Sequence, residues 1–161
     1  MISTSKKGVM KAPEGATVID GGGRTLMPGL IDNHVHLCMS ATSQMKMLDP
    51  VESYERLEGY AKKETTNVLM RGFTAVRDMG GPVFGIKTAV DKGEIPGPRI
   101  YPSGALISQT SGHGDFRMPK DRAHRFGGEF TKGERLGVGF IADGRDEVLT
   151  ATRENLRGGA A

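Results

Sequence analysis

The chain has 161 residues, a mass of 17.2 kDa and a formal net charge of +3 at pH 7. This length fits one domain or a piece of a larger protein and argues against two full domains. So small an excess of positive charge does not attract a polyanion by itself, and we expect no nucleic acid partner. The single cysteine, Cys38, excludes an intrachain disulfide framework and is typical of a reducing compartment, so we expect a cytoplasmic protein. No apolar run approaches the roughly 20 residues that span a bilayer, and we expect no membrane partner.

The residues before Leu30 predict a small β element. The segment from Thr17 to Met27 has the pattern of two short strands around a glycine turn, Gly21 to Gly23. Pro28 and Gly29 then form a turn that separates this element from the rest of the chain.

Strands and helices alternate in the remainder of the sequence. The predicted elements are a strand over 30–37, a helix over 49–71, a strand over 73–78, a helix that ends at Gly93, a strand over 99–103, and a helix that Asp143 caps and Gly158 and Gly159 end. This alternation is the signature of right-handed βαβ units and a parallel sheet. The predicted fold class is therefore α/β.

Residues 108–142 are rich in glycine, charge and polar side chains. They predict a loop far longer than the usual connection of a few residues, either functional or poorly ordered. A complete (β/α)8 barrel needs about 250 residues and eight strands, whereas this chain predicts three strands. An open three-stranded sheet would leave a long unpaired edge, so the unit is expected to be unfinished.

Two histidines on the first predicted strand are the main candidates for chemistry. His34 and His36 are two residues apart, so a strand presents both rings on one face and Val35 on the other. Neutral imidazole is the commonest protein ligand for zinc, and one strand can offer two imidazoles to a shared ion. The spacing alone also fits surface or hydrogen-bonded histidines.

Three segments resemble the amidohydrolase superfamily. VIDGGGRTLMPGLIDNHVHL over 18–37 closely resembles the start of the barrel in that superfamily. RGFTAVRDMGG over 71–81 and ISQTSGHGD over 107–115 follow in the right order and resemble the imidazolonepropionase-related branch, which includes prolidase-like and carboxypeptidase-like enzymes. The resemblance implies that residues 30–161 form the first three β/α units of a TIM barrel, and that residues 1–29 are a strand remnant of a small β-sandwich.

The resemblance also implies a metal site. In such enzymes the His-x-His pair holds a divalent metal, so His34 and His36 are implied ligands, with Zn2+ the expected ion and one or two ions in the complete site. The family completes the site with a carboxylated Lys or a Glu, two later His and an Asp on later strands, so we expect weak metal binding by this portion alone. The implied activity is hydrolysis of an amide or peptide-like C–N bond in a small substrate, such as an Xaa-Pro dipeptide, by metal-activated water.

Four further residues have two readings each. His113, beyond the third strand, is implied by the resemblance to line the pocket and bind substrate, and is otherwise a solvated loop histidine. Arg77 and Asp78 are either pocket residues or a structural ion pair, and we favour the structural role. Cys38, with no second thiol in the chain, is predicted to be a buried apolar residue rather than a catalytic one.

A basic loop supports a different class of function. The loop's charged and aromatic side chains are Arg117, Lys120, Arg122, Arg125, Lys132 and Arg135, against Asp121, Glu129 and Glu134, with Phe116, Phe126 and Phe130 between them. Such a loop could bind single-stranded nucleic acid, although its mixed charge favours a solvated loop or lid. A third reading is an interaction piece, which forms a homo-oligomer through its open sheet edge or needs a separate chain that carries the missing strands.

Overall fold

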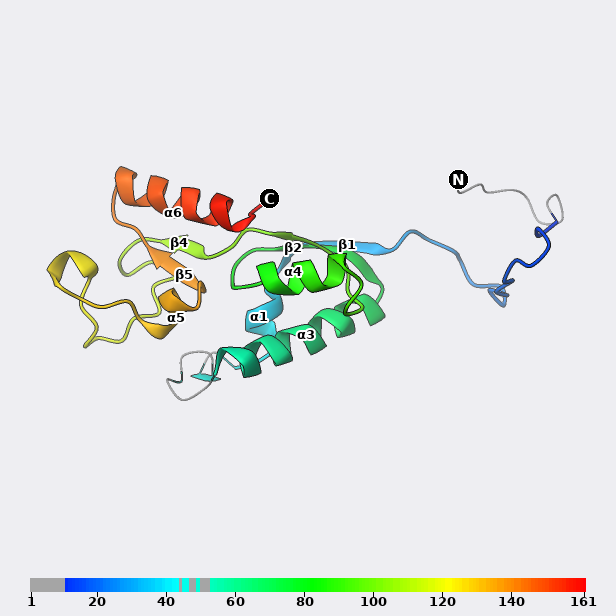
Figure 1. Ribbon diagram of the computed structural model, residues 1–161, viewed down its shortest axis with the longest axis horizontal. Helices are drawn as coiled ribbons and strands as arrows, with labels where there is room; N and C mark the ends of the chain where they lie inside the picture. Colours follow the sequence, from blue (N-terminus) through cyan, green and yellow to red (C-terminus); the bar gives the residue numbers. More distant parts are fainter. Residues whose placement is uncertain (1–10, 44, 47–48, 50–52) are drawn as a thin grey trace.

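The computed structural model describes residues 11–43, 45–46, 49 and 53–161. Three parallel strands form its main sheet in the order β1–β2–β3 (Figure 1). These strands are β1 (Leu30–Val35), β2 (Phe73–Asp78) and β3 (Arg99–Pro102). Val76 of β2 pairs with Asp32 on one side and with Ile100 on the other. All three predicted strands are confirmed, and Pro102 ends its strand, where its missing N–H costs no ladder hydrogen bond.

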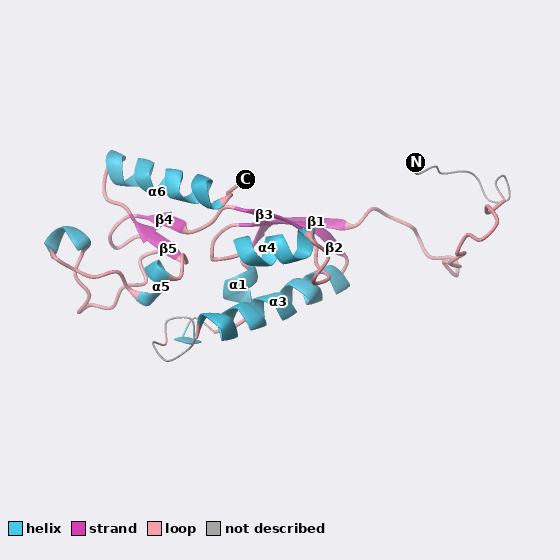
Figure 2. Ribbon diagram, viewed as in Figure 1, coloured by secondary structure: helices cyan, strands magenta, loops and turns pink. Residues whose placement is uncertain are grey.

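Three helices cover one face of this sheet (Figure 2): α1 (Leu37–Ser40), α3 (Tyr54–Met70) and α4 (Phe84–Asp91). The sequence predicted that the first long helix begins at Asp49, but α3 begins at Tyr54. Ser53 is its N-cap, because its hydroxyl accepts a hydrogen bond from the Arg56 N–H. Residues 50–52, on which part of that prediction rested, lie outside the described residues.

The core lies between the sheet and these helices. Its buried members are Leu37, Cys38, Ala61, Val68, Val76, Val83, Ile86 and Ile100. α3 contributes through Leu57, Ala61, Thr65 and Val68, whose spacing of three and four residues puts them on one helix face. The one hydroxyl in that row, on Thr65, donates to the Ala61 carbonyl at 2.8 Å and is therefore satisfied.

The opposite face of the sheet is open. Ile31 is 67% exposed and Tyr101 is 45% exposed, and the side chains of Arg77 and Arg99 are exposed as well. Register places Arg77 beside Tyr101, and Ala75 beside both Ile31 and Arg99, so these residues share one face.

A second parallel pair lies within and beside the segment predicted to be a loop. β4 (Leu106–Ser108) pairs with β5 (Gly139–Ile141), and a 3-10 helix (His124–Phe126) and α5 (Lys132–Arg135) lie between them. The prediction of an unstructured connection over 108–142 is therefore wrong. Three-residue strands are too short to show the alternation by which a strand is recognised.

The last helix, α6 (Arg145–Gly158), was predicted with the right end but the wrong cap. Its N-cap is Gly144 rather than the predicted Asp143. The Asp143 carboxylate instead accepts hydrogen bonds from the backbone N–H and the hydroxyl of Thr110. α6 is attached near its C-terminus by Asn155, whose amide bonds both the N–H and the carbonyl of Ala105 at 2.9 Å.

The segment over residues 11–29 extends away from the rest of the chain (Figure 1) and is exposed along its length. A turn forms where the glycines predicted it, with the Gly22 N–H donating to Asp20 and the Arg24 N–H to Gly21. The two strands predicted on either side are not formed in residues 11–29, and that prediction is wrong for this chain. Two short strands without an apolar surface to pack against are not stable alone.

The parallel pairing in both sheets and the helices between the strands confirm the predicted α/β fold class.

Candidate functional site

The two histidine rings lie side by side at the carboxyl end of β1. The ring centroids of His34 and His36 are 5.2 Å apart, and the ring planes are tilted by 76°. β1 ends at Val35, so His34 is still on the strand while His36 is the first residue of the turn into α1. The predicted neighbourhood of the two imidazoles is confirmed; His34 is exposed and His36 is half-buried.

One nitrogen of this pair is buried beside Gly80. Nδ1 of His36 has no hydrogen bond of good geometry in the part of the chain that the structure describes. Burial lowers the pKa of His36, the backbone of Gly80 opposes this shift, and the charges of His34 and His113 lower the pKa further. A lowered pKa favours neutral imidazole, which is the form that binds metal ions.

The histidine pair supplies two of the ligands that a metal site needs. Among residues 11–43, 45–46, 49 and 53–161, no group of three or more His, Cys, Asp and Glu side chains is arranged to hold a metal ion. The two nearby carboxylates already have backbone partners: Asp32 accepts from the His34 N–H at 3.0 Å, and Asp78 accepts from two N–H groups. A catalytic zinc normally has three protein ligands, so His34 and His36 would hold a cation together with a further donor.

Asp78 fixes the backbone around the histidines. This fully buried carboxylate accepts from the Leu37 N–H at 2.7 Å and from the Gly80 N–H at 3.1 Å, and so joins the turn after β1 to the turn after β2. Burial raises the pKa of Asp78 to about 6, against these two hydrogen bonds. Arg77 points to the open face of the sheet, while Asp78 lies on the covered face. The favoured structural ion pair between Arg77 and Asp78 is therefore wrong, because strand parity puts the two side chains on opposite faces of the sheet; Asp78 is structural as a hydrogen-bond acceptor instead.

His113 lies in the loop that follows β4, and its side chain is exposed. The base of this loop lies near the pair on β1, because a Cβ added at Gly114 would lie 3.5 Å from Leu106, and one added at Gly80 would lie close to both Leu106 and Nδ1 of His36. A buried ion pair between Asp115 and Arg117 holds this loop, and no sequence pattern predicted it.

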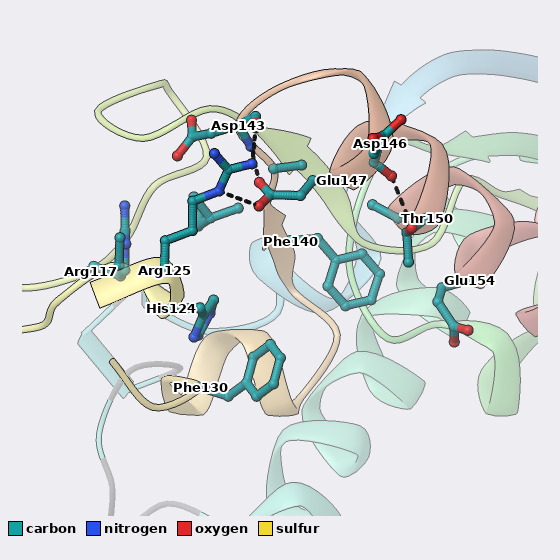
Figure 3. A pocket seen from close by; sticks show the side chains of 14 residues that line it. Arg117, His124, Arg125, Phe130, Phe140, Asp143, Asp146, Glu147, Thr150 and Glu154 are labelled. Atoms are coloured by element: carbon teal, nitrogen blue, oxygen red, sulfur yellow. Dashed lines mark hydrogen bonds and ion pairs between the residues drawn. The ribbon is translucent and has the colours of Figure 1, made fainter. Parts of the chain in front are cut away.

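A separate cavity of about 420 Å³ lies between α6 and the segment around the 3-10 helix (Figure 3). Phe130 and Phe140 line it, and the ion pair of Arg125 with Glu147, at 2.7 Å, crosses its rim. The three histidines considered above do not line it. Sequence reasoning missed this cavity, since the wall that faces α6 comes from the segment predicted to be a long loop.

The basic residues of that loop have specific partners in the fold. Arg117 pairs with Asp115 and Arg125 pairs with Glu147, each at 2.7 Å. These two cations are thus engaged by the protein's own carboxylates, which weakens the argument for a nucleic acid surface.

Two further predictions concern single residues and membrane spans. The prediction that Cys38 is buried is confirmed, although Cys38 lies in α1 rather than on a strand. Within the described residues, no helix has the length and apolar character to cross a bilayer.

Comparisons with known proteins agree with this geometry. A family model described as "Amidohydrolase family" matches residues 25–161, which include both histidines of β1. Ochratoxinase from Aspergillus niger is 36% identical over 145 residues, covering 84% of this chain and 29% of its own length. A prolidase solved with N-methylphosphonate-L-proline is 36% identical with a TM-score of 0.69, covering 83% of this chain and 32% of that one. A solved amidohydrolase is 37% identical with a TM-score of 0.72, covering 94% and 36%. The chain thus spans between 29% and 36% of the length of these relatives.

Proposed function

This chain belongs to the amidohydrolase family, and on that premise we propose that it is part of a metal-dependent hydrolase of carbon–nitrogen bonds in a small substrate. In this proposal β1, β2 and β3 are strands of a (β/α)8 barrel formed by residues 30–161 and residues beyond them. No strand is present in residues 11–29. The assignment of residues 1–29 to a small β domain therefore stays a prediction.

One observation carries the proposal. Two imidazoles stand 5.2 Å apart at the carboxyl end of a parallel strand, one of them with a buried nitrogen that has no hydrogen bond of good geometry in the described part of the chain. The carboxyl ends of strands are where α/β barrels build their active sites. We therefore assign His34 and His36 as ligands of a divalent cation, with Zn2+ as the proposed ion.

A cation bound there would supply Lewis-acid chemistry, activating water and polarising the scissile carbonyl. Four residues of this chain would have the following roles. His34 and His36 bind the ion, Asp78 holds the backbone of both turns, and the exposed imidazole of His113 contacts the substrate. The proline phosphonate carried by the similar prolidase supports an Xaa-Pro dipeptide as the first substrate to assay.

Zinc binding to the purified chain tests this assignment. Because this chain supplies two of the ligands, we expect calorimetry to detect weak binding of one Zn2+ by the wild type, and its loss in a His34→Ala, His36→Ala double variant. The matched control is His124→Gln, which removes a histidine that lies elsewhere in the fold and should leave zinc binding unchanged. Equal zinc binding by the double variant would refute the assignment, and no binding by any variant would favour the reading as an interaction piece.

A further inference from the structure

The loop over residues 109–115 is folded tightly around His113. The Gly112 N–H donates to the Gln109 carbonyl at 2.8 Å, the Asp115 N–H to the Gly112 carbonyl at 3.0 Å, and the Gly114 N–H to the Ser108 hydroxyl at 3.1 Å. Three backbone N–H groups in seven residues are thus bonded within the loop or to the end of β4. A loop with its backbone satisfied in this way has one defined shape.

The glycines on both sides of His113 allow that shape. A Cβ added at Gly112 would lie 2.4 Å from Oγ of Ser108, and one added at Gly114 would lie 3.0 Å from Cβ of Ser108. The backbone therefore rests directly on the last residue of β4. His113, between the two glycines, is exposed at the tip of the loop.

A buried ion pair closes the loop. Arg117 donates from Nε to Oδ1 of Asp115 at 2.8 Å and from Nη2 to Oδ2 at 2.7 Å, with side chains only 6% and 9% exposed. Oδ2 of Asp115 also accepts from the Ser111 N–H at 2.8 Å. Ser111 has a φ of +60°, and among the non-glycine residues that the structure describes no other has a positive φ. The Asp115 carboxylate thus stabilises a conformation that serine rarely adopts.

The same arginine ties this loop to the one after β5. Nη2 of Arg117 donates to the Thr110 hydroxyl at 3.1 Å, and that hydroxyl in turn donates to the Asp143 carboxylate. The Thr110 N–H donates to the other oxygen of Asp143 at 2.8 Å. The loop after β4 is therefore fixed at both ends by charged side chains.

Packing connects this loop to His36. A Cβ added at Gly114 would lie 3.5 Å from Cβ of Leu106, and one added at Gly80 would lie 2.8 Å from the Leu106 side chain and 3.6 Å from Nδ1 of His36. Leu106 and Gly80 thus form a continuous contact between the base of the loop and the histidine pair.

We propose that Asp115 and Arg117 are a positioning pair, which holds the 109–115 loop that carries His113 in one shape against Leu106, on the side where Leu106 and Gly80 lead to His36. The proposal rests on the proposed function for the roles of these histidines. A buried ion pair roughly breaks even in stability against apolar side chains of the same volume, so its advantage here is the geometry it imposes. Its two parallel hydrogen bonds fix direction as well as distance.

Cobalt NMR on the full chain tests this pair. Co2+ replaces Zn2+, and the paramagnetic broadening of the ring signals of His34, His36 and His113 is recorded. We expect all three to broaden in the wild type, and the His113 broadening to fall severalfold in Arg117→Gln while His34 and His36 stay broadened. The matched control is Arg125→Gln, which removes an exposed ion pair of the same segment and should behave as the wild type. Equal His113 broadening in Arg117→Gln would overturn the proposal.

A metal-free measurement separates this inference from the proposed function. Amide hydrogen exchange at Ser111 and Gly114 should accelerate severalfold in Arg117→Gln and stay unchanged in Arg125→Gln. If Co2+ broadens no histidine signal in the wild type, the metal assignment fails. Hydrogen exchange then tests the positioning pair without metal, and unchanged exchange rates in Arg117→Gln would refute it. If Arg117→Gln does not fold, Arg117→Lys replaces it in both measurements, since it keeps the positive charge and loses the two parallel hydrogen bonds to Asp115.

Discussion

His124 and Glu134 form a hydrogen bond of 2.8 Å between Nε2 and Oε1, while Nδ1 of the same ring lies 2.9 Å from the Gly128 carbonyl. A carboxylate and a carbonyl both accept, so the ring satisfies both only as the doubly protonated imidazolium. Glu134 also accepts from the Thr131 N–H, which completes the capping box of α5. Glu134 therefore joins the 3-10 helix to the start of α5.

This pair predicts a pH-dependent stability. The hydrogen bonds to Glu134 and Gly128 raise the pKa of His124, while burial and the charge of Arg117 oppose the shift. Because the folded-state pKa exceeds the ordinary value, the stabilisation is fully present below about pH 6.5 and is lost as pH rises through the raised pKa. Urea unfolding should show His124→Gln to be less stable than the wild type by about 1–2 kcal/mol at the acidic end. A difference that is constant from acidic to alkaline pH would contradict this account.

Asp78 predicts a large local cost of substitution. Asp78→Ala leaves the N–H groups of Leu37 and Gly80 buried without acceptors, and we expect a loss of about 2–4 kcal/mol in the free energy of unfolding. Asp78→Asn keeps one acceptor oxygen and should lose less. The control is Asp91→Ala, which removes a surface ion pair with Lys87 and should change stability by about 0.5 kcal/mol or less. Equal stability of Asp78→Ala and Asp91→Ala would rule out the bridging role.

The attachment of α6 depends on an amide. Asn155→Asp keeps the size of the side chain but replaces the donor to the Ala105 carbonyl with a second acceptor, so we expect a loss of about 2–4 kcal/mol. Thermal unfolding followed by circular dichroism measures it. Glu154→Gln, which removes an exposed ion pair with Arg157 one residue away, should leave the transition almost in place. If both variants unfold together, Asn155 does not anchor the helix.

Gly80 predicts an effect on the histidine pair. Ala at this position places a methyl group 2.8 Å from Leu106 and 3.6 Å from Nδ1 of His36, at a φ of +156°. We expect Gly80→Ala to lose about 1–3 kcal/mol of stability and to bind zinc more weakly, measured by urea unfolding and calorimetry. Gly59→Ala, in an open position of α3, should instead gain about 0.5–1 kcal/mol. Unchanged zinc affinity in Gly80→Ala would show that the packing around His36 is not tight.

The sequence predicted what depends on local periodicity. β2 was placed without error over Phe73–Asp78, because six residues rich in β-branched and aromatic side chains form a recognisable strand. The proximity of His34 and His36 followed from the two-residue period of a strand. β4 and β5 were missed because strands of three residues are too short to show a local pattern.

Side-chain partners were the least predictable part of the site. Asp115 and Arg117 are two residues apart, a spacing at which side chains do not face each other on a helix and share a face on a strand. A local turn, in which the Arg117 N–H donates to the Asp115 carboxylate at 3.2 Å, brings the carboxylate and the guanidinium together. In the same way, the role of Asp78 depends on the Leu37 N–H, 41 residues earlier in the chain, and no rule of sequence spacing connects the two.

The burial of Cys38 makes the rate of thiol labelling a measure of how fast the folded protein opens. Cys38 is the one cysteine of the chain and is 4% exposed, and burial together with the charge of Asp78 raises its pKa to about 11. Thiol reagents attack the thiolate, so at neutral pH the folded molecule is nearly inert toward them. At high reagent concentration, the labelling rate therefore equals the rate at which the core between the sheet and α3 opens and exposes Cys38.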